Sequence, residues 1–353
     1  MQIQENYNLS KLNTFGISVK AGFFVEIHKE TDVKELFYAP EFKNNKKLFL
    51  GGGSNVLFVK DFAGLVILNK LKGIEILEAP TKIEKDFVYV RAMGGEIWHE
   101  LVIFAVERGW WGIENLALIP GTVGAAPIQN IGAYGTELKD VLENVEVFDV
   151  NTGEKKVFSK EECELGYRDS IFKNKLKDKY FITAVTLKLS KIPARNATHS
   201  IAGGENKKKM YPALEEYLRK NKIEIKNSKD ISEAISAIRK NKLPNPAIIP
   251  NAGSFFKNVL VPLPRLRELL QAFPDLPYFD EGEVIKIPAG WLIEQCGWKG
   301  KRIGNVGVHE KQALVLVNYG EATGEEVLIL ANKIIAEVKE KFGLELVPEV
   351  NLI

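Results

Sequence analysis

The chain contains little cysteine and little histidine. Its 353 residues include two cysteines, Cys163 and Cys296, which stand far apart and outside any C-x-x-C pair. The four histidines are equally scattered, at His28, His99, His199 and His309. This spacing fits neither a zinc site nor a disulfide framework, so it predicts no metal and a reducing compartment. We therefore expect a cytoplasmic protein that works without metal catalysis.

The chain also lacks an excess of charge of either sign and lacks long apolar runs. Lysine and arginine total 48 against 46 aspartate and glutamate residues, which gives a formal net charge of +2. This balance gives no electrostatic reason to expect nucleic acid or an anionic membrane as a partner. No apolar run is long enough to span a bilayer, and residues 1–6 show no signal-peptide pattern.

The length and the apolar patterns predict an α+β protein with several domains. At 353 residues the chain exceeds the roughly 250–300 that one hydrophobic core supports, so two or three domains are expected. Thr31 is a fair N-cap for the first predicted helix, and Pro244 should end the third. The polar stretch 191–209 is the predicted domain boundary. Strands are expected at 21–27, 87–92, 145–150 and 180–189, and helices near 31–37, 101–105 and 231–238.

Residues 323–353 predict a capped helix followed by a strand. Thr323 and Glu326 form a capping box, and Gly343 stands where a C-terminal cap belongs. The buried helix face should carry Leu330, Ile334, Val338 and Phe342. In a strand over 344–353, alternation places Glu345, Glu349 and Asn351 on one face and Leu346, Val350 and Leu352 on the other. By itself this pattern fits an exposed glutamate at 349 better than a catalytic one.

Residues 115–136 form an uncharged stretch rich in glycine and proline. Pro120 and Pro127 exclude one continuous helix, and the glycines remove side chains that would keep another molecule away from the backbone. A large, flat, uncharged ligand fits this composition. A buried system of turns is the alternative, whereas a membrane segment would leave the amides of Asn115, Gln129 and Asn130 unsatisfied.

A second glycine-rich segment, Gly51-Gly52-Gly53-Ser54-Asn55, lies between two strand-like runs. Successive glycine N–H groups can form a concave anion site, so a diphosphate is the expected occupant. The segment is not the usual dinucleotide fingerprint, because Val56 stands where the third glycine should be and no helical pattern follows. Glycine-rich hairpins are common, so this segment alone does not define a function.

Ser254 lies in the turn Asn251-Ala252-Gly253-Ser254, just before two phenylalanines. The G-x-S-x-G elbow is missing and no histidine lies nearby in sequence, which disfavours a hydrolase nucleophile. A serine that donates a proton and a simple turn serine both remain open at this point.

Together, seven blocks in a fixed order resemble the UDP-N-acetylenolpyruvoylglucosamine reductase family in its longer form. They span nearly the whole chain, at 13–16, 51–58, 119–135, 167–172, 251–258, 288–297 and 348–350. The resemblance implies an α+β protein with an FAD-binding fold of the vanillyl-alcohol-oxidase (PCMH) type in two subdomains, followed by a substrate-binding α+β domain. The first implied subdomain is 1–72, to which 343–353 returns, and the second is 73–200. The implied substrate domain is 210–342.

The resemblance also implies a reaction. FAD would be bound non-covalently, NADPH would be the reductant, and a UDP-sugar, UDP-N-acetylglucosamine enolpyruvate, would be the substrate in peptidoglycan synthesis. A monomer is expected.

The same resemblance assigns roles to single residues. Arg168 and Glu349 match the residues that stabilise an enol intermediate, and Ser254 matches the proton donor. The positions that match substrate-binding residues are Tyr167, Tyr211, Lys242, Asn258 and Gln295, with Pro212 where the family usually has glycine after the lid tyrosine. Those that match FAD-binding residues are Gly51, Gly52, Gly53, Ser54, Asn55, Pro120, Gly121, Thr122, Gly124, Ala125, Gln129, Gly132, Ala133 and Tyr134.

Two other classes of protein stay open on sequence grounds. One is another FAD oxidoreductase of the same fold that acts on a sugar or alcohol. Such oxidases often tether their flavin through histidine or cysteine, and neither residue occurs at 50–58 or 115–136. The other is a nucleotide-sugar-binding protein without redox activity.

Overall fold

The computed structural model describes residues 1–78, 81, 84–193 and 210–353, and these residues form two compact units. Unit 1 comprises Met1–Tyr7, Ala21–Gly52 and Ala63–Asn241. Unit 2 comprises Asn8–Lys20, Gly53–Phe62 and Lys242–Ile353. Most of the predicted boundary at 191–209, with His199, lies outside the described residues. No helix in the part of the chain that the structure describes is long and apolar enough to cross a membrane.

Unit 1 contains a four-stranded sheet with two short helices, α1 (Glu30–Tyr38) and α2 (Pro40–Asn44). Its strand order is β1 (Gln4–Asn8), β2 (Lys20–Ile27), β5 (Phe62–Asn69) and β3 (Lys47–Leu50). Val33 and Leu36 of α1 and Phe42 of α2 are buried in one core with strand residues. The predicted N-cap at Thr31 is wrong, because the carboxylate of Asp32 accepts the His28 and Lys29 N–H groups (both 2.9 Å) and the helix therefore begins earlier.

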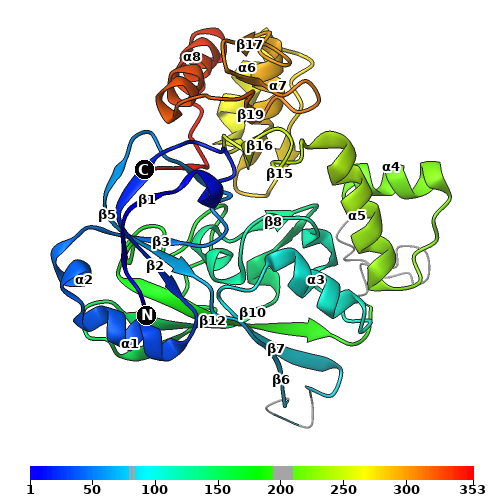
Figure 1. Cartoon of the computed structure of the whole chain (residues 1–353). Helices are drawn as coiled ribbons and strands as arrows, with labels where there is room; N and C mark the ends of the chain where they lie inside the picture. The colour runs from blue at the N-terminus through cyan, green and yellow to red at the C-terminus, as the bar shows by residue number, and fades with distance from the viewer. Residues whose placement is uncertain (79–80, 82–83, 194–209) are drawn as a thin grey trace. The chain divides into compact units, whose positions relative to one another are not determined.

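A second sheet of unit 1 is antiparallel throughout, and its strands lie side by side in Figure 1. Its order is β11 (Lys155–Ser159), β10 (Leu142–Asp149), β12 (Tyr180–Ser190), β7 (Phe87–Met93) and β6 (Ile74–Leu77). The predicted strands at 87–92, 145–150 and 180–189 are thus confirmed to within a few residues. Helices α3 (Trp98–Val106), α4 (Pro212–Asn221) and α5 (Ser228–Lys242) contribute buried side chains to the core that this sheet forms.

Unit 2 combines small sheets with three helices, α6 (Leu263–Ala272), α7 (Ala289–Gln295) and α8 (Gly324–Phe342). One sheet has the order β13 (Asn251–Ser254), β19 (Val315–Asn318), β18 (Val306–Val308) and β17 (Arg302–Ile303). Another has the order β14 (Val259–Val261), β16 (Ile285–Ile287) and β15 (Phe279–Asp280). A parallel pair joins β20 (Asn351–Leu352) to β4 (Val56–Leu57).

The C-terminal helix matches its prediction, and the segment after it does so only in part. Thr323 caps α8 through the predicted capping box with Glu326, and Gly343 ends the helix at φ 61°. The predicted strand over 344–353 is wrong except at its end, where β20 is two residues long. Pro348 has no N–H to donate, so it interrupts the hydrogen-bonding ladder of a strand. Leu352 is 44% exposed rather than buried with Leu346 and Val350.

Candidate functional site

The glycines at 51–52 and 121 allow two segments of unit 1 to approach each other. A Cβ atom on Gly52 would lie 2.9 Å from the Cα of Gly121, and one on Gly51 would overlap the Thr122 hydroxyl. The sequence interpretation explained these glycines by contact with a ligand, with a buried system of turns or an ordinary glycine-rich hairpin as the alternative. The structure shows that Gly51, Gly52 and Gly121 are also needed for close packing of the chain against itself.

Residues 120–125 are anchored to residues 94–98 through the backbone. Val123 and Gly124 donate their N–H groups to the carbonyl oxygens of Glu96 (2.8 Å) and Gly94 (2.9 Å). Pro120 and Gly121 precede the short helix η4 (Val123–Ala125), and Thr122 is its N-cap residue. The Thr122 Oγ1 atom is buried and has no hydrogen-bond partner among the described residues. A buried hydroxyl without a partner is costly, so it fits a site that a polar ligand completes.

The rest of the 115–136 stretch is a partly buried system of turns in which the Asn115 and Asn130 amides are hydrogen-bonded. It contains η3 (Glu114–Leu116), η5 (Pro127–Gln129), β8 (Gly132–Ala133) and β9 (Thr136–Glu137), so one continuous helix is excluded as predicted. Asn115 donates to the Tyr134 carbonyl oxygen (2.9 Å). The buried Asn130 donates to the Gly166 carbonyl oxygen (2.8 Å) and to Glu137 (3.0 Å). Asn115 and Asn130 therefore hold the stretch in shape.

His99 of α3 fixes the beginning of this stretch, and sequence reasoning missed it. Its Nδ1 accepts a hydrogen bond from the N–H of Leu118 (3.1 Å), a residue held at φ 56°. Burial lowers the pKa of His99, with Lys240 and Arg239 acting in the same direction and Glu100 against them. A neutral ring is required, because a protonated imidazole has no nitrogen left to accept.

We expect His99 to make stability depend on pH. A histidine whose pKa is lowered in the fold contributes stability that is complete above its ordinary pKa of about 6.5 and is lost as the pH falls through the lowered value. The unfolding temperature should therefore decline between neutral and acid pH, and His99→Gln should make this decline smaller. His28→Gln, at an exposed position, should leave the decline unchanged. Identical pH profiles for His99→Gln and wild type would contradict this role.

Arg168 lies in a tight turn of unit 1 in a strained backbone conformation. Its φ is 53°, a region that residues other than glycine rarely adopt. The Gly166 and Asp169 backbones pair across the turn at 3.1 and 3.3 Å. Arg168 Nη2 donates to the carbonyl oxygen of Gly132 (2.6 Å), and the guanidinium lies 5.5 Å from the ring centroid of Tyr167. The structure thus brings a predicted catalytic residue to a predicted cofactor-binding strand.

Two further predicted site residues of unit 1 meet through their rings. Tyr134 and Tyr211 pack edge to face, with centroids 5.2 Å apart. Burial raises the pKa of both hydroxyls. Pro212, which departs from the family pattern, is the first residue of α4, where its fixed φ and missing N–H suit a helix start. Tyr211 is therefore the N-cap residue of a helix.

In unit 2, the backbone brings Ser254 next to Glu349. Ser254 ends β13 and pairs with Val315, after Gly253 at φ 69°. The buried Asn251 accepts the Gly253 N–H (2.9 Å) and so fixes the turn before the serine. The Glu349 N–H donates to the carbonyl oxygen of Phe255 (2.8 Å), the residue that follows Ser254. Ser254 and Glu349, far apart in sequence, thus belong to neighbouring stretches of backbone.

The second half of the glycine-rich segment belongs to the same part of unit 2. Gly53, at φ 61°, passes so close to the Leu12 carbonyl that a Cβ atom would overlap it. Asn55 donates to the Glu349 carbonyl oxygen (3.4 Å) and its own carbonyl oxygen accepts the Asn351 N–H (3.1 Å). Ser54, between Gly53 and Asn55, is partly buried. This segment is therefore adjacent to the stretch that carries Glu349.

The remaining predicted substrate residues of unit 2 lie at helix ends. Lys242 is the exposed last residue of α5, and Gln295 is the exposed last residue of α7. Asn258 Oδ1 accepts the Ala289 N–H (3.1 Å) at the start of α7. Across the part of the chain described, no cluster of histidine, cysteine and carboxylate residues could hold a metal ion.

The close approach of Gly52 and Gly121 changes what a substitution should do. We expect Gly52→Val to separate the two segments, with a cost of roughly 1–3 kcal/mol from overpacking and a loss of bound flavin. Flavin absorbance per protein and thermal unfolding measure both effects. Gly290→Ala is the control, because a Cβ there would meet a flexible Gln312 side chain at 3.2 Å in a helix. Full flavin content in Gly52→Val would remove this segment from the site.

Comparisons with known proteins define the class of this chain. Residues 21–159 match a family model described as an FAD-binding domain. Residues 244–353 match the model of the UDP-N-acetylenolpyruvoylglucosamine reductase C-terminal domain. The chain therefore combines a flavin-binding domain with a family-specific C-terminal domain, which confirms the predicted fold class.

Full-length relatives give the family. A UDP-N-acetylenolpyruvoylglucosamine reductase from Flavobacterium johnsoniae is 45% identical over 354 residues, covering 100% of both chains. One from Amoebophilus asiaticus is 46% identical with the same coverage. The crystal structure of the reductase from Thermus caldophilus has a TM-score of 0.62 at 24% identity, covering 99% of this chain and 98% of that one. This chain belongs to the UDP-N-acetylenolpyruvoylglucosamine reductase family.

Proposed function

We propose that this chain reduces the enolpyruvyl group of UDP-N-acetylglucosamine enolpyruvate to UDP-N-acetylmuramate, with FAD and NADPH, in peptidoglycan synthesis. The observation that carries this function is 45% identity to a named reductase over the full length of both chains. The match of residues 21–159 to an FAD-binding domain identifies FAD as the cofactor. It supports an oxidoreductase rather than a binding protein without redox activity.

Three side chains are proposed to carry the chemistry on the substrate. FAD held in this site would, once reduced by NADPH, be the source of a hydride for the methylene carbon of the enolpyruvyl group. The electron pair of the double bond then moves toward the carboxylate and leaves an enolate, which Arg168 and Glu349 would stabilise. Ser254 would donate a proton to the neighbouring carbon and complete the reduction. Serine is a weak acid, so the basicity of that carbon must drive the transfer.

The proposed FAD site uses groups that fit the cofactor. The buried Thr122 hydroxyl has no partner among the described residues, and the backbone at 51–55 carries no bulky side chain before Asn55. Gly51–Asn55 would hold the diphosphate, and Pro120, Gly121, Gly124, Ala125, Gln129 and Gly132–Tyr134 would line the rest of the cofactor. Binding without a covalent bond is consistent with the absence of histidine and cysteine from both segments.

We also propose how the chain binds its substrate and how it is divided into subdomains. Tyr167, Tyr211, Lys242, Asn258 and Gln295 would bind the UDP-sugar, and a lysine suits a diphosphate. The subdomains 1–72 with 343–353, 73–200 and 210–342 describe the functional division of the chain. The enzyme would act as a monomer in the cytoplasm, without nucleic acid as a partner.

Flavin content and substrate dependence test the function. The purified protein should be yellow, and denaturation should release all flavin into solution. NADPH consumption should depend on the enolpyruvyl sugar and yield UDP-N-acetylmuramate, with no turnover of simple sugars or alcohols. Flavin that stays on the denatured chain, together with alcohol oxidation, would favour the oxidase alternative, and a colourless protein would favour the binding protein.

A further inference from the structure

The first turn of α3 holds the glycine- and proline-rich stretch of unit 1 through a row of hydrogen bonds. Trp98 donates its backbone N–H to the carbonyl oxygen of Gly121 (3.1 Å) and its indole N–H to that of Leu116 (3.1 Å). Between these two bonds, His99 Nδ1 accepts the N–H of Leu118 (3.1 Å). His99 is the titratable member of this row, so it is the bond that a change of pH can break.

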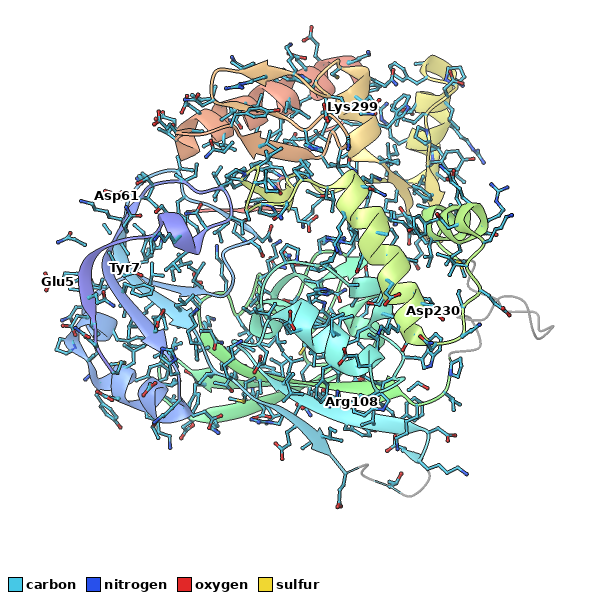
Figure 2. The ribbon with its side chains drawn as sticks, turned by 45° about the vertical axis from the view of Figure 1, so that its right-hand side comes forward. Glu5, Tyr7, Asp61, Arg108, Asp230 and Lys299 are labelled. Atoms are coloured by element: carbon cyan, nitrogen blue, oxygen red, sulfur yellow. The ribbon has the colours of Figure 1, made fainter. Side chains whose placement is uncertain are left out.

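Helix α3 is fixed at both ends and cannot follow the stretch if the stretch moves. Leu101 and Ala105 are buried in the unit 1 core. Just beyond the end of the helix, Arg108, labelled in Figure 2, donates from Nη1 to the Phe104 carbonyl oxygen (2.9 Å). Its guanidinium carbon also lies 3.6 Å from the centroid of the Phe104 ring. His99 is therefore a fixed point against which the stretch is held.

Leu118, on the other side of this hydrogen bond, has a backbone conformation that needs support. Its φ is 56°, in the left-handed region that a leucine rarely adopts. Such a conformation persists only where its surroundings impose it. Pro120 restricts the residue before it to extended backbone. A rotation at Leu118 would therefore carry over to Gly121, which lies against Gly52 in the proposed cofactor site.

Only a neutral ring can accept the bond from Leu118, because a protonated imidazole carries N–H groups on both nitrogens. Burial lowers the pKa of His99. Lys240 and Arg239 of α5 act in the same direction, and Glu100 of α3 acts against them. The ring is therefore neutral at neutral pH and becomes protonated in acid.

We propose that His99 is a positioning residue for FAD: as a neutral ring it holds Leu118, and through it residues 120–125, in the conformation that binds the cofactor. The proposal rests on the function given above, because these residues belong to the FAD site proposed there. They include Thr122, whose buried hydroxyl has no partner among the described residues. If FAD binds only the form with a neutral ring, its affinity should fall by up to about tenfold for each pH unit below the pKa of His99.

Release of FAD from the holoenzyme tests this role, measured between about pH 5 and pH 8 as the free flavin that passes an ultrafiltration membrane. His99→Leu removes the acceptor and leaves the Leu118 N–H unpaired, so it should weaken FAD binding roughly 10- to 100-fold at neutral pH. His99→Asn puts a carbonyl oxygen in the place of Nδ1 and does not titrate. It should bind FAD as wild type does at neutral pH and keep that affinity in acid. His28→Asn, at an exposed position outside this row, should follow wild type throughout.

The outcomes separate a positioning role from a structural one. Equal FAD affinity of wild type and His99→Leu, whatever their unfolding temperatures, would overturn the proposal in favour of a structural histidine. Equal pH profiles of wild type and His99→Asn would overturn it as well, and this comparison decides the point even if His99→Leu does not fold. A wild-type protein that retains no flavin at neutral pH would instead contradict the proposed function itself.

Discussion

Replacing Ser254 with alanine is expected to leave flavin reduction by NADPH nearly intact and to slow reoxidation by the enolpyruvyl sugar by roughly 10² or more. The hydride step from NADPH needs no proton from this serine, whereas completion of the substrate does. In rapid-mixing experiments that follow the flavin absorbance, the variant should therefore stay bleached after substrate is added.

Two companion variants make this expectation specific. Ser254→Cys should restore part of the second rate, because a thiol can also donate a proton. Glu349→Gln should slow the same half-reaction, since it keeps the shape of the side chain and removes its acid. If Ser254→Ala slows both half-reactions equally, or neither, the serine is a turn residue that follows Gly253.

Replacing Arg168 should separate a chemical role from a conformational one. Arg168→Ala and Arg168→Gly both remove the guanidinium, so each should slow reduction of the enolpyruvyl sugar by roughly 10²–10³. Only glycine tolerates φ 53° without strain, so Arg168→Gly should be more stable than Arg168→Ala by about 1 kcal/mol. Rates come from single turnovers and stability from denaturant unfolding.

The opposite pattern would count against this account of Arg168. If both variants turn over at the wild-type rate, the arginine does not stabilise the intermediate. If the alanine variant is the more stable of the two, the turn at 166–169 does not impose the backbone conformation of residue 168.

The regular elements were the part that sequence could predict. Helix α8 has the predicted apolar face from Leu330 to Phe342 and both of the predicted caps. Local hydrogen bonds decide where such a helix begins and ends. Strand β12 lies in the centre of its sheet and reads as a largely apolar run, and its neighbour β10 shows apolar residues between polar ones. These features depend on near neighbours in the chain, which a single sequence contains.

Features that depend on competition between neighbours or on distant partners were harder to predict. Asp32 took the capping role given to Thr31, and Pro348 shortened the last strand to two residues. The glycines at 52 and 121 signalled a close approach, but the sequence did not say that each lies against the other. The partner of a close approach is a matter of tertiary structure.

The candidate site shows the same division. Composition and spacing left Ser254, Glu349 and Arg168 as ordinary residues, and only the resemblance to a family gave them roles. The backbone bond between Glu349 and Phe255 then placed two of them on neighbouring stretches, which no local pattern contains.

An anaerobic single-turnover experiment tests the central claim most directly. One equivalent of NADPH should bleach the bound flavin, and one equivalent of the enolpyruvyl sugar should then restore its full absorbance and give one equivalent of UDP-N-acetylmuramate. UDP-N-acetylglucosamine, which lacks the double bond, should leave the flavin bleached. Recovery of the colour with UDP-N-acetylglucosamine, or no recovery with the enolpyruvyl sugar, would contradict the proposed reaction.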